Sequence, residues 1–189
     1  MTETIVSANL SSQKNAQTHV VCCIVARTNS TRLPRKVLKR IGEKTMIEKI
    51  IYRMKSVPSL DAIYVATSAH PDDKILCDLA ERHGVCSYAG SELSVIDRIL
   101  DIARAEQATH IVRVTGDNIY TDSKLLDRLI RQALDEKVDY ARVEGAPIGV
   151  TGEVIAVPAL QNCLLRIDPD LSEYLMLYMF DPDTYRTCV

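Results

Sequence analysis

Hydrophobic and polar positions follow two different periods along this chain. A short apolar run from Val20 to Ala26, rich in β-branched residues, predicts a buried strand. Between Met46 and Met54 the apolar residues recur at helical spacing, which predicts a helix from about Thr45 to Ser56. Residues 1–18 are polar and show neither period, so we expect a flexible amino-terminal tail.

The alternation of short strands and amphipathic helices continues along the chain. Further strands are expected at about 62–67, 85–88, 110–115, 139–143 and 153–157. Further helices are expected at about 72–83, 93–107, 123–136, 158–165 and 171–180. Gly84 is a candidate helix terminator, and Ser91 or Ser94 a candidate helix cap. Helices of 10 to 15 residues between short strands predict an α/β protein with a mostly parallel sheet covered on both faces.

Charge is distributed unevenly along these 189 residues, which are enough for one domain. The net charge is -2, yet the segment from Arg27 to Lys55 holds ten Lys and Arg against two acids, Glu43 and Glu48. That segment therefore carries +8 and the rest of the chain -10. A positive site on an acidic body favours a small anionic ligand and argues against nucleic acid as the partner.

Six cysteines are present, but none forms a Cys-x-x-Cys pair or a zinc-type cluster with histidine. The amino-terminal residues lack the features of a signal peptide, and no apolar run approaches the ~18 residues of a membrane span. We therefore expect a cytoplasmic protein in a reducing compartment, with no membrane partner.

A basic loop follows directly on the first predicted strand. Its five cations are Arg27, Arg32, Arg35, Lys36 and Lys39. Because such charges repel one another, one interpretation is that the loop binds the phosphates of a nucleotide through charge-assisted hydrogen bonds. A solvated basic loop is the alternative.

Two other segments follow predicted strands and should reach the same sheet edge, where open α/β sheets bind ligands. Ala66, Thr67 and Ser68 could contact a base or ribose, and Asp117 should project from the turn at Gly116. A carboxylate facing bound phosphates needs a cation between them, and Mg²⁺ is held by one or two carboxylates plus substrate phosphates. Asp117 is thus either a metal ligand or a turn-forming residue. Asp122 is the weaker candidate, because it could simply cap the next helix.

Glycine-rich phosphate-binding motifs of the Walker and dinucleotide types are absent from the sequence. The loop would therefore hold phosphates mainly with its side-chain cations. The four histidines share no metal spacing, and we expect them to be structural or exposed.

These residues together resemble the cytidylyltransferases of the CMP-sugar synthetase type. The similarity runs from about Val20 to Tyr185 and is greatest to the spore-coat-polysaccharide branch, a neighbour of the sialate and 3-deoxy-manno-octulosonate synthetases. The matching segments are Ala26-Arg27-x-x-Ser30-Thr31-Arg32-Leu33-Pro34-x-Lys36, Val65-Ala66-Thr67-Ser68, Gly90-Ser91-Glu92, Val95-x-Asp97-Arg98, Arg113-x-Thr115-Gly116-Asp117 with Asp122, Gly152-Glu153-Val154 and Glu173-Tyr174.

The resemblance implies a Rossmann-like, three-layer α/β/α nucleotide-diphospho-sugar transferase fold. It also implies transfer of CMP from CTP to an acidic or amino sugar with release of pyrophosphate, in surface polysaccharide or glycan synthesis. By position, the phosphates would contact Arg27, Arg32 and Lys36. The nucleotide would lie near Asn29 and Ser30, and Arg98 is a looser candidate for contact with the nucleotide or the sugar acid. Asp117 would bind Mg²⁺. Catalysis would rest on Arg27, Lys36 and Asp117. Because such enzymes are commonly dimers, the resemblance also implies a possible homodimer.

Two departures from the family pattern are visible. Residue 35 is Arg where this branch usually has Gly, so its side chain would crowd or strengthen the phosphate site. We also expect residues 19–189 to form a single nucleotidyltransferase domain that lacks the family's last strand, with its second metal-binding Asp, and the final helix. A catalytically impaired nucleotide-binding or assembly module, or a glycosyltransferase that uses a nucleotide sugar, are therefore alternative functions.

Overall fold

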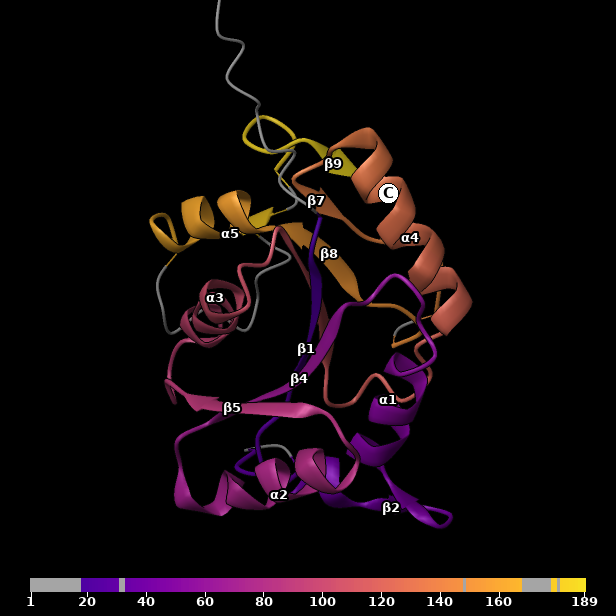
Figure 1. The fold of residues 1–189 in the computed structure, drawn as a ribbon, viewed down its shortest axis with the longest axis vertical. Coiled ribbons are helices and arrows are strands. Elements are labelled where there is room, and N and C mark those ends of the chain that lie inside the picture. Colours follow the sequence, from indigo (N-terminus) through magenta and orange to yellow (C-terminus); the bar gives the residue numbers. More distant parts are fainter. Residues whose placement is uncertain (1–17, 31–32, 148, 168–177, 180) are drawn as a thin grey trace, which may run out of the picture.

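The computed structural model describes residues 18–30, 33–147, 149–167, 178–179 and 181–189 (Figure 1). Their main sheet has seven strands. These are β1 (Val20–Val25), β4 (Ala62–Ser68), β5 (Cys86–Gly90), β6 (His110–Thr115), β7 (Tyr140–Ala141), β8 (Glu153–Ala156) and β9 (Thr187–Cys188). The α-helices are α1 (Met46–Met54), α2 (Lys74–Arg82), α3 (Val95–Ala105), α4 (Ser123–Glu136) and α5 (Val157–Leu164).

The strand order is β5-β4-β1-β6-β8-β7-β9, with β1 near the centre. The first four strands pair in parallel, β8 is antiparallel to both β6 and β7, and β9 is parallel to β7. The mostly parallel α/β architecture expected from the sequence is therefore confirmed.

Helices cover both faces of the sheet, which makes three layers. Alternate residues of β1 face opposite ways: Cys22 and Ile24 join the core under α1, α2 and α4, and Val21 and Cys23 the core under α3 and α5. All four side chains are fully buried. An apolar run without polar alternation is what a strand buried on both faces requires, and burial raises the pKa of both cysteine thiols, as expected for inert core residues.

Several element boundaries follow directly from local chemistry. The strand expected at 110–115 and the helix expected at 123–136 are confirmed to the residue. Ser94 caps α3 by accepting from the backbone N–H of Asp97, and Gly84 follows α2 with a φ of +64°. Thr45 and Glu48 form a reciprocal capping box at the start of α1.

Other boundaries differ from the sequence-based expectation. The strand expected at 139–143 is only the two-residue β7. The short hairpin of β2 (Arg40–Ile41) and β3 (Lys44–Thr45) was not expected, and neither was β9. Two-residue strands carry too few positions to show a period. The helix expected at 171–180 falls almost wholly on residues outside those described. Among the described residues, no helix is both long and apolar enough to cross a membrane.

Candidate functional site

The carboxyl ends of β1, β4 and β6 meet at one edge of the sheet. From β1 the chain passes to β4 and β5 on one side, and then returns to β6 on the other. The strand order thus reverses between β1 and β6. We call the region outside the carboxyl ends of these two strands the switch-point crevice, because open α/β sheets bind ligands at such a point. The basic loop leaves β1 at this crevice, and Thr115 to Asp117 leave β6 there.

The basic loop is closed at its base by the backbone of Thr28. The Thr28 carbonyl accepts hydrogen bonds from the amides of Ser30 (3.0 Å) and Arg35 (2.8 Å). After the loop, the 3₁₀ helix η1 (Lys36–Leu38) is anchored by the buried side chain of Val37. Arg35 precedes η1 in the left-handed conformation, with a φ of +54°. Glycine adopts this conformation at less steric cost than other residues do, which agrees with the Gly that the family resemblance implies at this position.

Lys36 and Asp117 join the basic loop to the end of β6. Their Nζ and Oδ2 atoms are 2.6 Å apart, and the Thr115 hydroxyl donates to Oδ1 of Asp117 at 2.6 Å. Burial raises the pKa of the Asp117 carboxyl, but the hydrogen bonds from Lys36 and Thr115 outweigh that effect and hold the pKa below its usual value. The loop and Asp117 thus meet in a direct ion pair, which the sequence analysis did not anticipate; the metal-binding role of Asp117 remains a prediction.

Gly116 makes this approach possible. A Cβ atom built on it would stand 2.8 Å from Cγ1 of Val37, 3.0 Å from Cβ of Ala26 and 3.3 Å from the carbonyl oxygen of Val25. Its amide donates to that same carbonyl at 2.8 Å. Any side chain at this position would force η1 and β6 apart, so the glycine sets the distance between Lys36 and Asp117.

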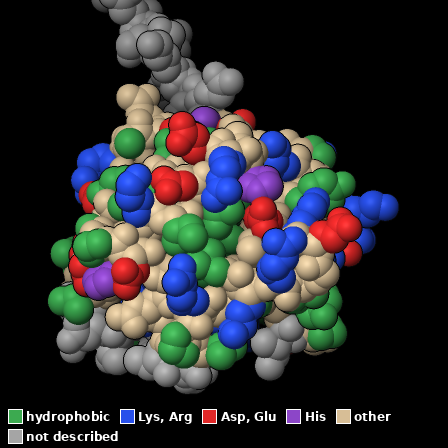
Figure 2. All heavy atoms as spheres, turned by 90° about the horizontal axis from the view of Figure 1, so that it is seen from below, with side chains coloured by type: hydrophobic (Ala, Val, Ile, Leu, Met, Phe, Trp, Pro, Cys, Tyr) green, Lys and Arg blue, Asp and Glu red, His purple; other side chains and the backbone are tan. Residues whose placement is uncertain are grey.

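Two other loop cations, Arg35 and Lys39, lie on a different surface. Arg35 and Lys39 line a hollow of about 510 Å³ beside α2, together with Arg40 and Arg82, and Asp117 does not border it. Viewed from below, the face bearing α2 and β2 shows Lys and Arg interspersed with hydrophobic and acidic side chains (Figure 2). Arg35 therefore neither crowds the Lys36–Asp117 contact nor adds a cation to it.

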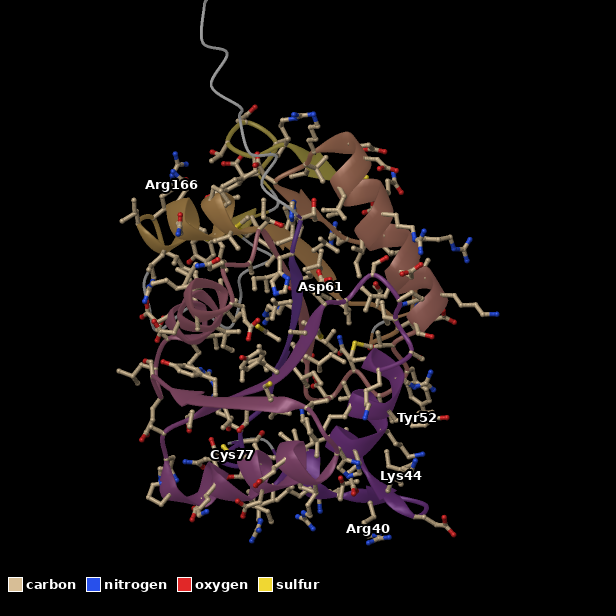
Figure 3. The ribbon with its side chains drawn as sticks, in the orientation of Figure 1. Arg40, Lys44, Tyr52, Asp61, Cys77 and Arg166 are labelled. Atoms are coloured by element: carbon tan, nitrogen blue, oxygen red, sulfur yellow. The ribbon has the colours of Figure 1, made fainter. Side chains whose placement is uncertain are left out.

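A second group of cations lies at the outer corner formed by the β2–β3 hairpin and α1. Arg40, Lys44 and Tyr52 lie there in Figure 3, with Lys44 Nζ 4.5 Å from the centre of the Tyr52 ring. This corner borders a hollow of about 600 Å³ whose lining does not include Asp117. The +8 segment is thus spread over several surfaces, and only part of it reaches the strand ends.

The predicted nucleotide-binding residues of the loop lie around its base. Arg27 and Ser30 are half-buried and Asn29 is exposed; Arg32 falls outside the described residues. Arg98, on α3, is buried, and its Cγ would lie 3.0 Å from a Cβ on Gly90, at the carboxyl end of β5. The structure thus brings Arg98 to the same sheet edge as the end of β4. The roles assigned to these residues remain predictions.

Ala66, Thr67 and Ser68 are buried at the end of β4. The hydroxyls of Thr67 and Ser68 donate to Oδ2 of Asp73, a residue that the sequence analysis did not single out. Asp73 is 1% exposed. The signal that could have found it is an Asp soon after a strand end, at the start of a helix, where it resembles an ordinary helix-capping acid. Contact of Thr67 and Ser68 with a base or ribose remains a prediction.

Asp122 caps α4, as one interpretation of the sequence held. Its Oδ1 accepts from the amides of Lys124 and Leu125, both at 2.9 Å. Within the described part of the chain, no three His, Cys, Asp or Glu side chains gather into a potential metal site. Of the two acids considered from the sequence, Asp117 is the one that stands at the switch-point crevice.

Beside the crevice, β6 and β8 share a buried ion pair. Arg113 and Glu153 are direct cross-strand partners, with Nη1 and Oε2 2.6 Å apart, and the Tyr140 hydroxyl donates to Oε1 at 2.9 Å. Burial, followed by the charge and hydrogen bond of Glu153, raises the pKa of Tyr140 far above its usual value. The segment from Gly152 to Val154 is thereby fixed against β6.

This arrangement matches one family of known proteins. A family model described as cytidylyltransferase matches residues 21–178. The chain belongs to the cytidylyltransferase family. The resemblance inferred from the sequence is thus confirmed over most of its length.

Three relatives show where this chain stands within the family. An uncharacterized protein of Methanocaldococcus jannaschii is 34% identical over 143 residues, 76% of this chain and 59% of that protein. The spore coat polysaccharide biosynthesis protein SpsF of Bacillus subtilis is 32% identical over 174 residues, 88% of this chain and 72% of that protein. A 3-deoxy-manno-octulosonate cytidylyltransferase of Koribacter versatilis is 33% identical over 120 residues, 62% and 44% of the two chains. The chain therefore spans about half to three quarters of the length of these relatives.

Solved structures confirm the fold. A cytidylyltransferase from Leptospira borgpetersenii superimposes with a TM-score of 0.83 at 25% identity, covering 90% of this chain and 74% of that one. A CMP:2-keto-3-deoxy-manno-octonic acid synthetase, solved in complex with CTP, gives 0.72 at 18% identity, with 90% and 89% covered.

Proposed function

We propose that this cytidylyltransferase transfers CMP from CTP to an acidic or amino sugar, with release of pyrophosphate, in the synthesis of a surface polysaccharide or glycan. The observation that carries the proposal is the 2.6 Å contact between Lys36 Nζ and Asp117 Oδ2. This contact joins Lys36, a basic-loop cation able to bind phosphate, to a carboxylate at the switch point between β1 and β6. Two opposite charges at one ligand-binding crevice suit a ligand that combines phosphates with a metal ion.

In the proposed reaction a sugar hydroxyl attacks the α-phosphorus of CTP in line with the leaving group. The new bond joins the sugar oxygen to that phosphorus, the bond from that phosphorus to the oxygen bridging to the β-phosphate breaks, and the hydroxyl proton passes to solvent water. Arg27 and Lys36 would hold the phosphate oxygens and neutralise the charge that accumulates on pyrophosphate. Such catalysis consists mainly of positioning and charge stabilisation, and needs no covalent enzyme intermediate.

The donor chemistry at Asp117 fits a divalent cation of the Mg²⁺ type. Its carboxylate is 46% exposed and its pKa is lowered. The hydroxyl of Thr115 lies 2.6 Å from Oδ1 of Asp117 and 3.0 Å from the amide oxygen of Asn118. Mg²⁺ characteristically takes one or two carboxylates and completes its shell with water and substrate phosphates. When bound, the ion would neutralise phosphate charge, while Lys36, released from Asp117, would contact the phosphates directly.

The sugar class is supported by the relatives' names, which refer to spore coat polysaccharide and to 3-deoxy-manno-octulosonate. CTP as donor is supported by the family model and by the fold neighbour solved with CTP. The individual sugar would be identified by assaying a panel of acidic and amino sugars.

The test has two stages, binding and turnover. Melting temperatures with CTP, UTP, ATP and GTP, each with and without Mg²⁺, should show a shift selective for CTP, since a ligand that binds the folded state stabilises it. Pyrophosphate release from CTP should then appear with one class of sugar. CTP binding without turnover across the panel would favour a nucleotide-binding or assembly module, and a shift only with nucleotide sugars would favour a glycosyltransferase.

A further inference from the structure

Asp73 ends the 3₁₀ helix η2 (Pro71–Asp73), and its carboxylate contacts segments from two strand ends. Oδ1 accepts from the backbone N–H of Thr28 at 2.7 Å and from the Thr28 hydroxyl at 2.6 Å. Oδ2 accepts from the Thr67 hydroxyl at 3.0 Å, and from the hydroxyl and the amide of Ser68. Five donors therefore converge on one carboxylate that is 1% exposed.

The carboxylate does not serve the helix that it precedes. Asp73 stands at the N-cap position of α2, yet its side chain makes no capping hydrogen bond there. The cap of η2 is His70, whose Nδ1 accepts from the amide of Asp72. Capping is the usual reason for an Asp at a helix start. Here the side chain instead points across to the first residues of the basic loop.

Thr28 links Asp73 to Ser30 and Arg35 of the basic loop. Its amide and hydroxyl are held by Asp73, while its carbonyl accepts the amides of Ser30 and Arg35. All the backbone and side-chain polar groups of Thr28 are thereby engaged. These hydrogen bonds constrain the backbone of Thr28. They therefore also constrain where the chain places the neighbouring residues, Arg27 and Asn29.

We propose that Asp73 is a positioning residue of the nucleotide site, which holds Thr28 and, through the Thr28 carbonyl, Ser30 and Arg35 of the basic loop, and so determines affinity for the nucleoside triphosphate. The inference rests on the proposed function for the identity of the ligand. Burial raises the pKa of Asp73, but the hydrogen bonds from Ser68 and Thr28 outweigh that effect and lower it. The carboxylate is therefore ionised at neutral pH, able to accept from all five donors at once.

The test compares Asp73→Asn with a matched control, Asp127→Asn. Asp127 makes the same kind of contact away from the crevice: its Oδ1 accepts from the amide (3.0 Å) and hydroxyl (2.6 Å) of Ser59. An asparagine at residue 73 keeps one acceptor oxygen, so it can hold the Thr28 side or the Ser68 side, but not both. We expect the dissociation constant for CTP with Mg²⁺, measured by calorimetry, to rise at least tenfold in D73N and less than twofold in D127N.

A second pair of variants, with smaller changes, tests the same contact if D73N folds poorly. Thr28→Val removes the hydroxyl that donates to Asp73, and Ser59→Ala removes the equivalent hydroxyl that donates to Asp127. We expect weaker CTP binding in T28V alone. If T28V and D73N both act through the same contact, the double variant should bind CTP about as weakly as D73N.

Amide hydrogen exchange gives a readout that needs no ligand. The amides of Thr28, Ser30 and Arg35 should exchange faster in D73N than in the unaltered protein, and remain unchanged in D127N. The inference is overturned if D73N binds CTP as tightly as D127N and these three amides stay protected. Absence of nucleotide binding in the unaltered protein would instead overturn the proposed function, and faster exchange in D73N would still support Asp73 as the residue that positions the loop.

Discussion

Two ion pairs involve acceptor or donor residues four positions apart, Arg113 in β6 and Asp117 just after it. Both pairs have the same nitrogen–oxygen distance, 2.6 Å. Lys36–Asp117 lies just beyond the end of the strand, with side chains 28% and 46% exposed. Arg113–Glu153 lies within the sheet, with side chains 10% and 14% exposed. The two contacts are alike in chemistry and differ in access to solvent.

That difference in exposure predicts different roles. An exposed pair contributes little to stability and can exchange its partner for a ligand. A buried pair is costly to break, because each charge left alone stays desolvated. We therefore expect Lys36–Asp117 to serve ligand binding and Arg113–Glu153 to serve stability, and each expectation can be tested separately.

The largest effect is expected for Asp117→Ala on turnover. Loss of a group that stabilises charge in the transition state commonly costs about 100- to 1,000-fold in rate. We expect pyrophosphate release to fall by about that factor, with a melting temperature close to that of the unaltered protein. Undiminished pyrophosphate release in this variant would remove Asp117 from the mechanism. It would also contradict a functional role for the Lys36–Asp117 pair.

The next effect is on stability, in Glu153→Ala. Removing one partner of a buried pair costs about 3 kcal/mol or more, and it would also deprive the Tyr140 hydroxyl of its acceptor. For a chain of this size, that corresponds to a fall of about 6 to 12 °C in melting temperature, measured by calorimetry. Asp117→Ala is the matched control.

One result would contradict a purely structural role for Arg113–Glu153. If Glu153→Gln kept its melting temperature but lost turnover with the sugar, Glu153 would belong to the substrate site. That outcome would place Gly152-Glu153-Val154, one of the segments that carry the family resemblance, at the substrate.

A smaller effect concerns salt. Raising ionic strength from about 0.01 to 1 M shortens the screening length from about 30 to 3 Å. The coupling energy of Lys36 and Asp117, from a double-mutant cycle in urea unfolding, should then fall toward zero from at most about 1 kcal/mol. The coupling of Arg113 and Glu153 should change much less. Equal salt sensitivity of the two couplings would show that both pairs are equally hydrated.

The smallest effect concerns pH. The lowered pKa of Asp117 means that its contribution to stability is present above its unfolded value, near 4, and is lost as pH falls through the lower folded value. In Asp117→Asn, stability should therefore fall less steeply between pH 5 and pH 2, by about 0.5 kcal/mol for an exposed pair. Identical slopes in the two proteins, from urea midpoints at each pH, would contradict the lowered pKa.

Much of the fold could be predicted where local chemistry is self-sufficient. The helix at Ser123–Glu136 has its own cap in Asp122 and a clear apolar face, and β1 is a run of apolar residues too short for a helix. β7 and β9 could not be predicted to length, because each is only two residues long and is defined by its partners in the sheet. The antiparallel pairing of β8 likewise depends on distant residues.

The site was predictable to the level of its elements. The ends of β1 and β6 were expected to meet, because carboxyl ends of parallel strands share an edge. The direct contact of Lys36 with Asp117, across 81 positions of sequence, depends on the close approach at Gly116, which no local sequence pattern reveals. Arg35 and Lys39 have the same charge as Lys36 but face the hollow beside α2, since the turn into η1 directs each side chain differently.

The central position of β1 also has a consequence for synthesis on the ribosome. Its six residues, Val-Val-Cys-Cys-Ile-Val, contain no charge, proline or glycine, and β6, the partner on one edge, begins 90 residues later, at His110. At ordinary translation rates of about 5 to 20 residues per second, that interval is roughly 5 to 20 s. During it, an aggregation-prone segment has a free edge, so a slow-translating or chaperone-poor expression host should yield more insoluble chain than a fast or chaperone-rich one.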